Sequence, residues 1–207
     1  MIEFYLERNV LMIFIDGVVG AGKSTLAKIL ADELNIPLYK EPVFENPILD
    51  KFYHNKKKYS FPLQIFLLNK RLKMVNDAMK TNGVFDRSIF CDIIFANILT
   101  EDGDMLKEEL ELYKEVSENL LSHITLPELT IYLEISTDNA INRIKQRGRD
   151  FELLMPRDYW EKLNIHYRNY FKNYNKSKLL IINVDNLDIV NNEIDRKKIL
   201  EKIKKNL

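Results

Sequence analysis

The segment from Gly17 to Thr25 constrains the fold of this chain most, because its glycine spacing ends in Lys23 and Ser24. This pattern lets backbone N–H groups converge on phosphate oxygens without Cβ atoms in the way. An apolar run from Val10 to Asp16 precedes the segment, and a helical pattern from Lys23 to Leu34 follows it. The sequence therefore predicts a strand, a phosphate-binding loop and a helix whose N-terminus favours anions. A chance glycine-rich turn is the alternative.

Within this loop each side chain has an expected contact with a nucleoside triphosphate such as ATP. We expect Lys23 to reach the β- and γ-phosphates and Ser24 to hold Mg²⁺. The predicted nucleotide-binding residues of the loop are Gly17, Val18, Val19, Gly20, Ala21, Gly22, Lys23, Ser24 and Thr25.

Short apolar runs alternate with longer helical patterns along the rest of the chain. Strands are expected at 10–16, 38–40, 84–85, 129–135 and 179–184. Helices are expected at 23–34, 47–54, 61–79, 88–99, 105–123, 137–146, 157–174 and 188–205. The alternation predicts an α/β fold, a five-stranded parallel sheet flanked by helices, within one domain over residues 1–207.

Composition excludes several classes of partner. Basic and acidic residues balance at 31 each, so no global field attracts a nucleic-acid polymer or an anionic membrane. The lysine triplet at 56–58 is interpreted as a solvated loop. Cys91 is the single cysteine, and the three histidines are scattered, so any metal should be Mg²⁺ on oxygen ligands. Glu3 and Glu7 interrupt the apolar start, which predicts a cytoplasmic protein without a signal segment.

Charged side chains follow two of the expected strands, at the edge where parallel sheets bind ligands. Glu41 precedes Pro42 and is placed to accept a proton from an attacking hydroxyl; a loop glutamate without a role is the alternative. Asp86 and Arg87 follow the next strand, and Ser88 is placed to cap a helix. We expect Asp86 to help hold Mg²⁺ and Arg87 to neutralise a transferred phosphoryl group. A surface ion pair is the alternative.

Two polar residues share one face of the helix expected at 61–79. Gln64 is the only polar side chain between Phe61 and Leu68, and Arg71 lies two turns further along. An amide that donates and accepts in parallel suits the edge of a nucleobase. A core glutamine satisfied by the backbone is the alternative.

Three arginines surround Gly148, namely Arg143, Arg147 and Arg149. Arg143 and Arg147 share a helix face, where like charges repel unless an anion lies between them. We expect the segment at about 143–153 to form a lid that closes over phosphates and excludes water. A solvated basic helix end is the alternative.

Taken in order, these motifs resemble the deoxyribonucleoside kinase family, which includes deoxycytidine, deoxyguanosine and deoxyadenosine kinases. The resemblance covers most of the chain and also includes the segment Glu41-Pro42-Val43, Tyr53 and Glu152. It implies that Glu41 is the base on the nucleoside 5′-hydroxyl and that Arg87 orients this hydroxyl. Tyr53 and Glu152 would hold the sugar 3′-hydroxyl, and Gln64 would read the base.

The resemblance extends to the lid and the metal site. It implies that Arg143, Arg147 and Arg149 contact the donor phosphates. Asp86 stands where animal members frequently carry glutamate, and its shorter carboxylate is compatible with the same role near Mg²⁺.

Base preference is implied by two further positions. Arg71 and Asp92 match positions where deoxycytidine- and purine-directed members carry Arg and Asp. This favours deoxyadenosine, with deoxycytidine and deoxyguanosine as further substrates, and a plain salt bridge is the alternative. Asn46 stands where animal members often place tryptophan, so the base pocket must be lined differently. Either Phe95 or Ala96 would face the base.

The sequence thus predicts phosphoryl transfer from MgATP to the 5′-hydroxyl of a deoxyribonucleoside, for nucleotide salvage. The resemblance also implies a homodimer, formed through the helices at 61–79 and 105–123. Two alternatives remain: a nucleoside monophosphate kinase similar to thymidylate kinase, and a nucleotide-binding switch without catalysis. A monophosphate acceptor would need further cations, whereas Tyr53, Gln64 and Glu152 suit an uncharged nucleoside.

Overall fold

Within the described residues, five parallel strands form a central sheet in the order β2-β3-β1-β4-β5. The structure, a computed structural model, describes residues 10–42 and 46–207, so Glu3, Glu7 and Val43 lie outside the described residues. The strands are β1 (Met12–Asp16), β2 (Leu38–Tyr39), β3 (Gly83–Asp86), β4 (Leu129–Glu134) and β5 (Lys178–Asn183). The predicted fold class is confirmed.

Strand β1 lies in the middle of the sheet and is buried along its whole length. Its register pairs Ile15 with Asp86 of β3 and with Ile131 of β4. Since all strands run parallel, the residues after β1, β2 and β3 meet at one edge of the sheet. The candidate motifs at Gly17, Glu41 and Arg87 therefore converge at that edge.

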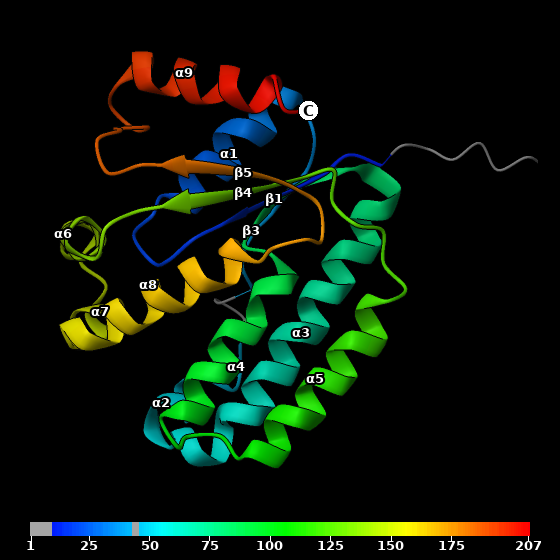
Figure 1. Cartoon of the computed structure of the whole chain (residues 1–207), viewed down its shortest axis with the longest axis vertical. Coiled ribbons are helices and arrows are strands. Elements are labelled where there is room, and N and C mark those ends of the chain that lie inside the picture. The colour runs from blue at the N-terminus through cyan, green and yellow to red at the C-terminus, as the bar shows by residue number, and fades with distance from the viewer. Residues whose placement is uncertain (1–9, 43–45) are drawn as a thin grey trace, which may run out of the picture.

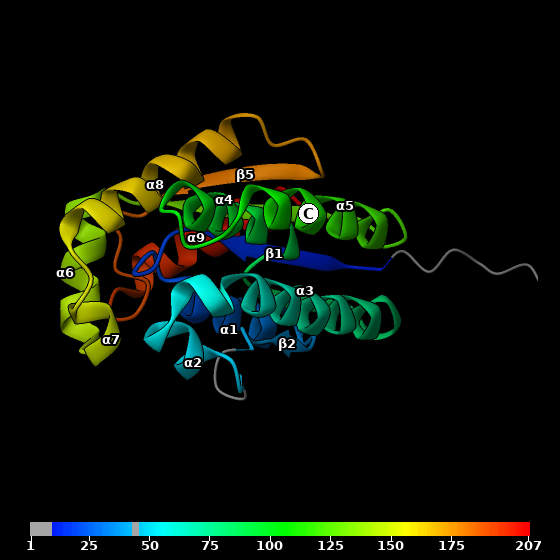
Figure 2. The same cartoon turned by 90° about the horizontal axis from the view of Figure 1, so that it is seen from below.

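Helices cover both faces of the sheet (Figure 1). Their bounds are α1 (Lys23–Leu34), α2 (Leu49–His54), α3 (Lys56–Thr81), α4 (Asp92–Glu101), α5 (Lys107–Leu121), α6 (Thr137–Arg147), α7 (Asp150–Leu153), α8 (Arg157–Lys172) and α9 (Glu193–Lys204). Helices α1 and α9 lie on one side of the sheet, and α3, α4, α5 and α8 lie on the other, as both views show (Figures 1 and 2). None of the described helices combines the length and apolarity that crossing a bilayer requires.

The two faces of β1 enter two clusters of buried side chains. Ile13 and Ile15 pack in the cluster that contains Leu26 of α1, whereas Met12 and Phe14 pack in the cluster that contains Tyr113 of α5. This alternation follows from the two-residue period of a strand. A rigid strand buried on both faces holds the loop that leaves it at Gly17.

Helix α3 begins earlier than predicted, and the interpretation of the lysine triplet as a loop was wrong. Residues 56–58 form the first turn of α3, where the Asn55 side chain accepts a hydrogen bond from Lys58 N at 3.1 Å. Pro62 lies inside the helix, although proline is most common at the first helical position. The cap at Asn55 sets the start of the helix.

Candidate active site

The phosphate loop joins β1 to α1 as predicted, and its glycines adopt conformations that other residues rarely do. Gly17, Gly20 and Gly22 have φ values of +148°, +86° and +97°. Lys23 curls back over the loop and donates to the carbonyl oxygens of Gly17 and Val18 at 2.8 and 3.0 Å. Burial, together with the charge of Arg87, lowers the pKa of Lys23 below its usual value. The ammonium group is thus held within the loop, ready for phosphate oxygens.

The loop faces a cavity of about 260 Å³ at the carboxyl edge of the sheet. Its lining residues are Val19, Lys23, Ser24, Lys28, Leu38, Lys40, Glu41, Asp86, Arg87, Arg147, Arg149 and Glu152. Most of the charged side chains are cationic, which suits a polyphosphate. We call this the donor cavity.

Two side chains that line the donor cavity carry oxygen atoms that could bind a magnesium ion. Asp86 is buried, and its Oδ1 atom has no hydrogen-bond partner within the described part of the chain. Ser24, at the start of α1, lines the same cavity. One carboxylate and a hydroxyl are what Mg²⁺ takes from a protein when phosphates and water complete its octahedron. The residues present therefore fit the predicted ion.

Glu41 lies between two buried arginines. Its Oε1 atom is 3.1 Å from Arg71 Nη2 and 3.2 Å from Arg87 Nε. Burial would raise the pKa of the Glu41 carboxyl, but Arg87, Arg71 and Lys23 together lower it below its usual value. The carboxylate therefore stays ionised and able to accept a hydrogen bond at neutral pH.

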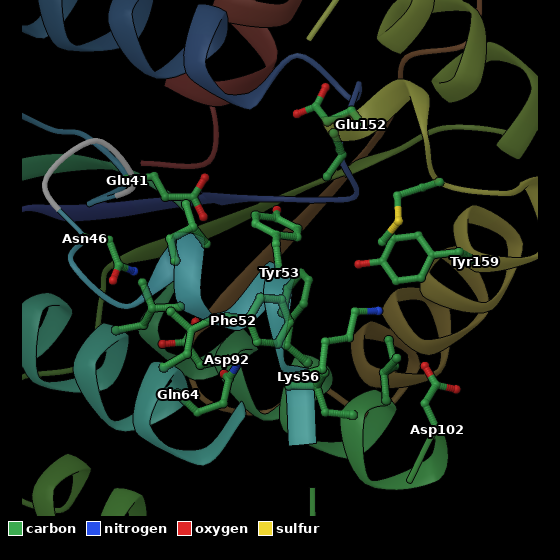
Figure 3. A pocket seen from close by; sticks show the side chains of 18 of the residues that line it. Glu41, Asn46, Phe52, Tyr53, Lys56, Gln64, Asp92, Asp102, Glu152 and Tyr159 are labelled. Carbon is green, nitrogen blue, oxygen red and sulfur yellow. The ribbon is translucent and has the colours of Figure 1, made fainter. Parts of the chain in front are cut away.

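A second, more apolar cavity of about 200 Å³ lies beyond Glu41 (Figure 3). Of the predicted substrate-binding residues, it is lined by Glu41, Tyr53, Gln64, Arg87, Asp92, Phe95 and Glu152. Gln64 is buried, and the hydrogen bonds among the described residues include none to its amide. We call this the acceptor cavity.

Of the two residues proposed to face the base, only Phe95 is among the described residues that line the acceptor cavity. Phe95 lines the acceptor cavity, with the Arg87 guanidinium 4.7 Å from the centre of its ring. Ala96 is fully buried in the core cluster that contains Phe14. The Ser88 hydroxyl caps the short 3₁₀ turn Ile89–Cys91 ahead of α4, by accepting from Phe90 N at 3.1 Å.

Arg71 and Asp92 form a buried ion pair beside the acceptor cavity. Arg71 Nη1 is 2.8 Å from both carboxylate oxygens of Asp92. Asp92 lines the cavity, but Arg71 does not. Arg71 contacts two carboxylates that do line it, those of Asp92 and Glu41, and so holds both in place. Burial raises the pKa of Asp92 to about 6, although Arg71 and Arg87 act in the opposite direction.

The lid arginines do not act as one group. Arg147 Nη2 lies 2.5 Å from Glu152 Oε2, Arg149 Nη1 lies 3.5 Å from Glu152 Oε1, and all three line the donor cavity. Arg143 lines neither cavity, because its Nη2 donates to the carbonyl oxygens of Val184 and Leu187 at 2.6 and 3.0 Å. Gly148 ends α6 with φ +69°.

The donor and acceptor cavities meet at a shared set of residues. The side chains common to both are Val19, Glu41, Arg87, Arg149 and Glu152. Glu41 and Arg87, which follow β2 and β3, thus stand where a phosphoryl group would pass from one ligand to the other.

Sequence reasoning missed one wall of the acceptor cavity, to which α2, the start of α3, the loop before α8 and α8 itself contribute. The lining residues from this wall are Phe52, Lys56, Met155, Tyr159 and Trp160, and Figure 3 labels Phe52, Lys56 and Tyr159 among them. The apolar residues among them recur at helical spacing and resemble core positions, so no local signal marks them. Asn46 also lines this cavity, and its Nδ2 atom is buried without a partner among the described residues.

The shape of the phosphate loop predicts a strong effect of Gly20→Ala. A Cβ at Gly20 would lie 2.6 Å from the carbonyl oxygen of Ala140, at a φ of +86°. We expect ATP affinity to fall by about tenfold or more, since left-handed geometry alone costs about 1–2 kcal/mol for an L-residue. ATP titration of the purified variant measures this.

Gly103→Ala is the matched control for that substitution. Gly103 has a φ of +73°, and an added Cβ would lie more than 4 Å from any other atom in the described part of the chain, beyond its immediate chain neighbours. It lies in the turn after α4, away from the donor cavity. Its ATP affinity should stay unchanged, and an unchanged affinity in Gly20→Ala as well would contradict the tight approach of loop and α6.

Comparisons with known proteins identify the family of the chain. A family model described as deoxynucleoside kinase matches residues 13–207. A deoxyadenosine kinase of Lactobacillus acidophilus is 36% identical over 206 residues, which cover 95% of this chain and 96% of that protein. A deoxyadenosine/deoxycytidine kinase of Bacillus subtilis is 36% identical over 208 residues, which cover 98% and 95%. The structure of a deoxyadenosine kinase from M. mycoides with bound dATP has a TM-score of 0.82 at 34% identity, and the match covers 94% of this chain and 100% of that one.

The chain belongs to the deoxynucleoside kinase family. It is an enzyme that phosphorylates deoxynucleosides, as the sequence predicted. The monophosphate-kinase and switch alternatives are thereby set aside.

Proposed function

We propose that the chain transfers the γ-phosphoryl group of MgATP to the 5′-hydroxyl of deoxyadenosine, with deoxycytidine and deoxyguanosine as further acceptors. The observation that carries this proposal is the meeting of two cavities at Glu41 and Arg87. One cavity suits a polyphosphate, and the other is more apolar and suits an uncharged nucleoside. The relatives named deoxyadenosine kinase and deoxyadenosine/deoxycytidine kinase support the choice of acceptors.

In the proposed mechanism Glu41 accepts the proton of the attacking 5′-hydroxyl. Its lowered pKa makes it a weak base, which suffices because phosphoryl transfer passes through a loose transition state. Arg87 lies 3.2 Å from Glu41 and orients the same hydroxyl while neutralising charge on the transferred group. Lys23 and the lid arginines Arg147 and Arg149 hold the donor phosphates. Arg143 would support the lid indirectly, because its hydrogen bonds to the carbonyl oxygens of Val184 and Leu187 hold α6 in place.

A magnesium ion held by Ser24 and Asp86 would neutralise charge on the donor phosphates. The unpartnered Oδ1 atom of Asp86 supports this assignment.

The nucleoside would enter the acceptor cavity with its base toward Gln64 and Asp92 and its sugar toward Tyr53 and Glu152. Gln64 and Asp92 both line the cavity, and together they offer a donor and two acceptors to a base with an amino group. Phe95 would provide the apolar face on which the base packs.

The order of substrates is tested by measuring kcat/KM for the four deoxynucleosides with MgATP. We expect deoxyadenosine to give the highest value and thymidine the lowest, because thymine lacks the exocyclic amine that Asp92 would accept from. A thymidine value above that of deoxyadenosine would contradict the proposed base reading while leaving the kinase activity itself intact.

Asp92 gives this selectivity a pH dependence. As the pH falls through about 6, the carboxylate gains a proton and ceases to be a charged acceptor. Since kcat/KM reports the free enzyme, its value for deoxyadenosine should fall about tenfold between about pH 7 and pH 5 if the ionised form alone is competent. A pH–rate profile measures this. Asp92→Asn should have lower activity but lack that acidic limb, and an unchanged limb in the variant would assign it to another group.

We also propose that the chain forms a homodimer, through the helices expected at 61–79 and 105–123, and that it is located in the cytoplasm. Leu106 and Leu112, of the segment proposed for dimerisation, are exposed apolar side chains. The single cysteine, Cys91, is buried and free, which suits a reducing compartment. Residues 1–207 would form one kinase domain whose lid spans about 143–153.

A further inference from the structure

Asp16, the last residue of β1, is a fully buried carboxylate that lines neither cavity. Its Oδ1 atom accepts a hydrogen bond from the backbone N–H of Gly17 at 2.7 Å. Its Oδ2 atom accepts one from the backbone N–H of Ser88 at 2.9 Å. One side chain thus joins the first residue of the phosphate loop to the residue that follows Arg87, 71 positions further along the chain.

Both backbones that flank this carboxylate are in conformations that need support. Gly17 has a φ of +148°, and Arg87, which carries a long side chain, has a φ of +88°. A non-glycine residue in the left-handed region costs about 1–2 kcal/mol and persists where its surroundings enforce it. Arg87 N also donates to the carbonyl oxygen of Ile15 at 2.9 Å. The end of β1 therefore fixes the peptide groups on both sides of Arg87.

This backbone conformation sets the direction of the Arg87 side chain. The guanidinium lies 4.7 Å from the centre of the Phe95 ring and brings Nε to 3.2 Å from Glu41. A rotation of the Arg87 backbone toward an ordinary φ would move that group away from the junction of the two cavities. Because Asp16 also holds Gly17, the same carboxylate sets the spacing between the donor loop and this arginine.

We propose that Asp16 is a positioning residue that locks the phosphate loop and Arg87 in register, so that donor and acceptor meet in line. The inference rests on the role proposed above for Arg87. Asp16 would act without contacting a substrate. Two parts of the site that follow different strands, the phosphate loop after β1 and Arg87 after β3, would both depend on its carboxylate.

The test is a double-mutant cycle on turnover with Asp16→Asn and Arg87→Lys. Asparagine keeps the size of aspartate but has one acceptor oxygen, so either Gly17 N or Ser88 N loses its partner. We expect Asp16→Asn to lower kcat by about tenfold or more in the wild-type background, since a misplaced group costs that much or more. In the Arg87→Lys background it should lower kcat further by less than about threefold, because coupled residues are not additive.

Thr130→Val controls for the loss of buried hydrogen bonds alone. Thr130 is fully buried in β4, and its hydroxyl contacts Tyr174 Oη at 2.8 Å and Ser177 Oγ at 2.9 Å. This variant should have a lower melting temperature and a wild-type kcat. If Asp16→Asn yields no folded protein, Asp16→Glu, which keeps both acceptor oxygens but displaces them, takes its place in the cycle.

The outcomes separate this inference from the function on which it rests. Equal losses of kcat from the Asp16 substitution in both backgrounds would mean a purely structural role and would overturn the inference alone. A wild-type kcat in Arg87→Lys would overturn the role of Arg87 and the inference with it. Strongly non-additive effects of Asp16→Asn and Arg87→Lys on kcat, together with a wild-type kcat in Thr130→Val, would support the proposed positioning role of Asp16.

Discussion

Replacing Glu41 by glutamine is expected to lower kcat by about a hundredfold or more, because the 5′-hydroxyl loses the group that takes its proton. Such a loss corresponds to about 2.7 kcal/mol of transition-state stabilisation. Glutamine keeps the shape of the side chain but not the charge that lies 3.1 and 3.2 Å from Arg71 and Arg87. The effect should therefore fall on kcat, while the Kd of deoxyadenosine changes little. Steady-state kinetics and nucleoside titration measure the two quantities separately.

Glu134→Gln is the matched control for that change. Glu134 ends the parallel strand β4, is partly buried, and lines neither cavity. Its variant should keep a wild-type kcat. Wild-type turnover in Glu41→Gln would remove Glu41 from the mechanism.

Replacing Lys23 by methionine is expected to reduce kcat by about a hundredfold to a thousandfold, the range seen when one preorganised donor is removed from a developing charge. Lys23 is the cation that the phosphate loop itself carries, and its Nζ is held within 3.0 Å of the loop carbonyls. Methionine retains most of the apolar stem, so the buried packing should survive. The measurement is kcat together with the KM of ATP.

The matched control for Lys23→Met is Lys145→Met, on the exposed side of α6. Lys145 lines neither cavity, and its variant should behave as wild type. Nucleoside affinity should also be unaltered in Lys23→Met. A Lys23→Met enzyme with normal kcat and normal KM for ATP would contradict the placement of the donor phosphates on the loop.

Features with local causes were predictable from the sequence. The glycine spacing, the apolar run before it and the apolar period after it fixed β1, the phosphate loop and the bounds of α1 (Lys23–Leu34). The convergence of Glu41 and Arg87 followed from parallel strands, whose carboxyl ends share one edge.

Features set by distant contacts were not predictable. Arg143 binds the carbonyl oxygens of Val184 and Leu187, and nothing near Arg143 in the sequence marks those partners. Phe95 lines the acceptor cavity on α4, which follows the turn Ile89–Cys91, and the family resemblance left Phe95 and Ala96 both eligible. Tyr159 and Trp160 look like core residues until α8 is placed beside the cavity.

The charge of the acceptor most directly separates a deoxynucleoside kinase from a nucleoside monophosphate kinase similar to thymidylate kinase. The acceptor cavity offers Gln64, Tyr53 and an apolar wall, whereas the cations Lys23 and Arg147 line the donor cavity alone. A substrate that already carries a phosphate would bring negative charge into a space where, among the described residues, four carboxylates outnumber three cations. The carboxylates are Glu41, Asp92, Asp102 and Glu152, and the cations are Lys56, Arg87 and Arg149.

The decisive measurement compares deoxyadenosine with thymidine monophosphate as acceptors for the γ-phosphoryl group of labelled MgATP, with the products identified by chromatography. We expect labelled deoxyadenosine 5′-monophosphate and no labelled thymidine diphosphate. Label in thymidine diphosphate, with none in a deoxyadenosine product, would contradict this expectation.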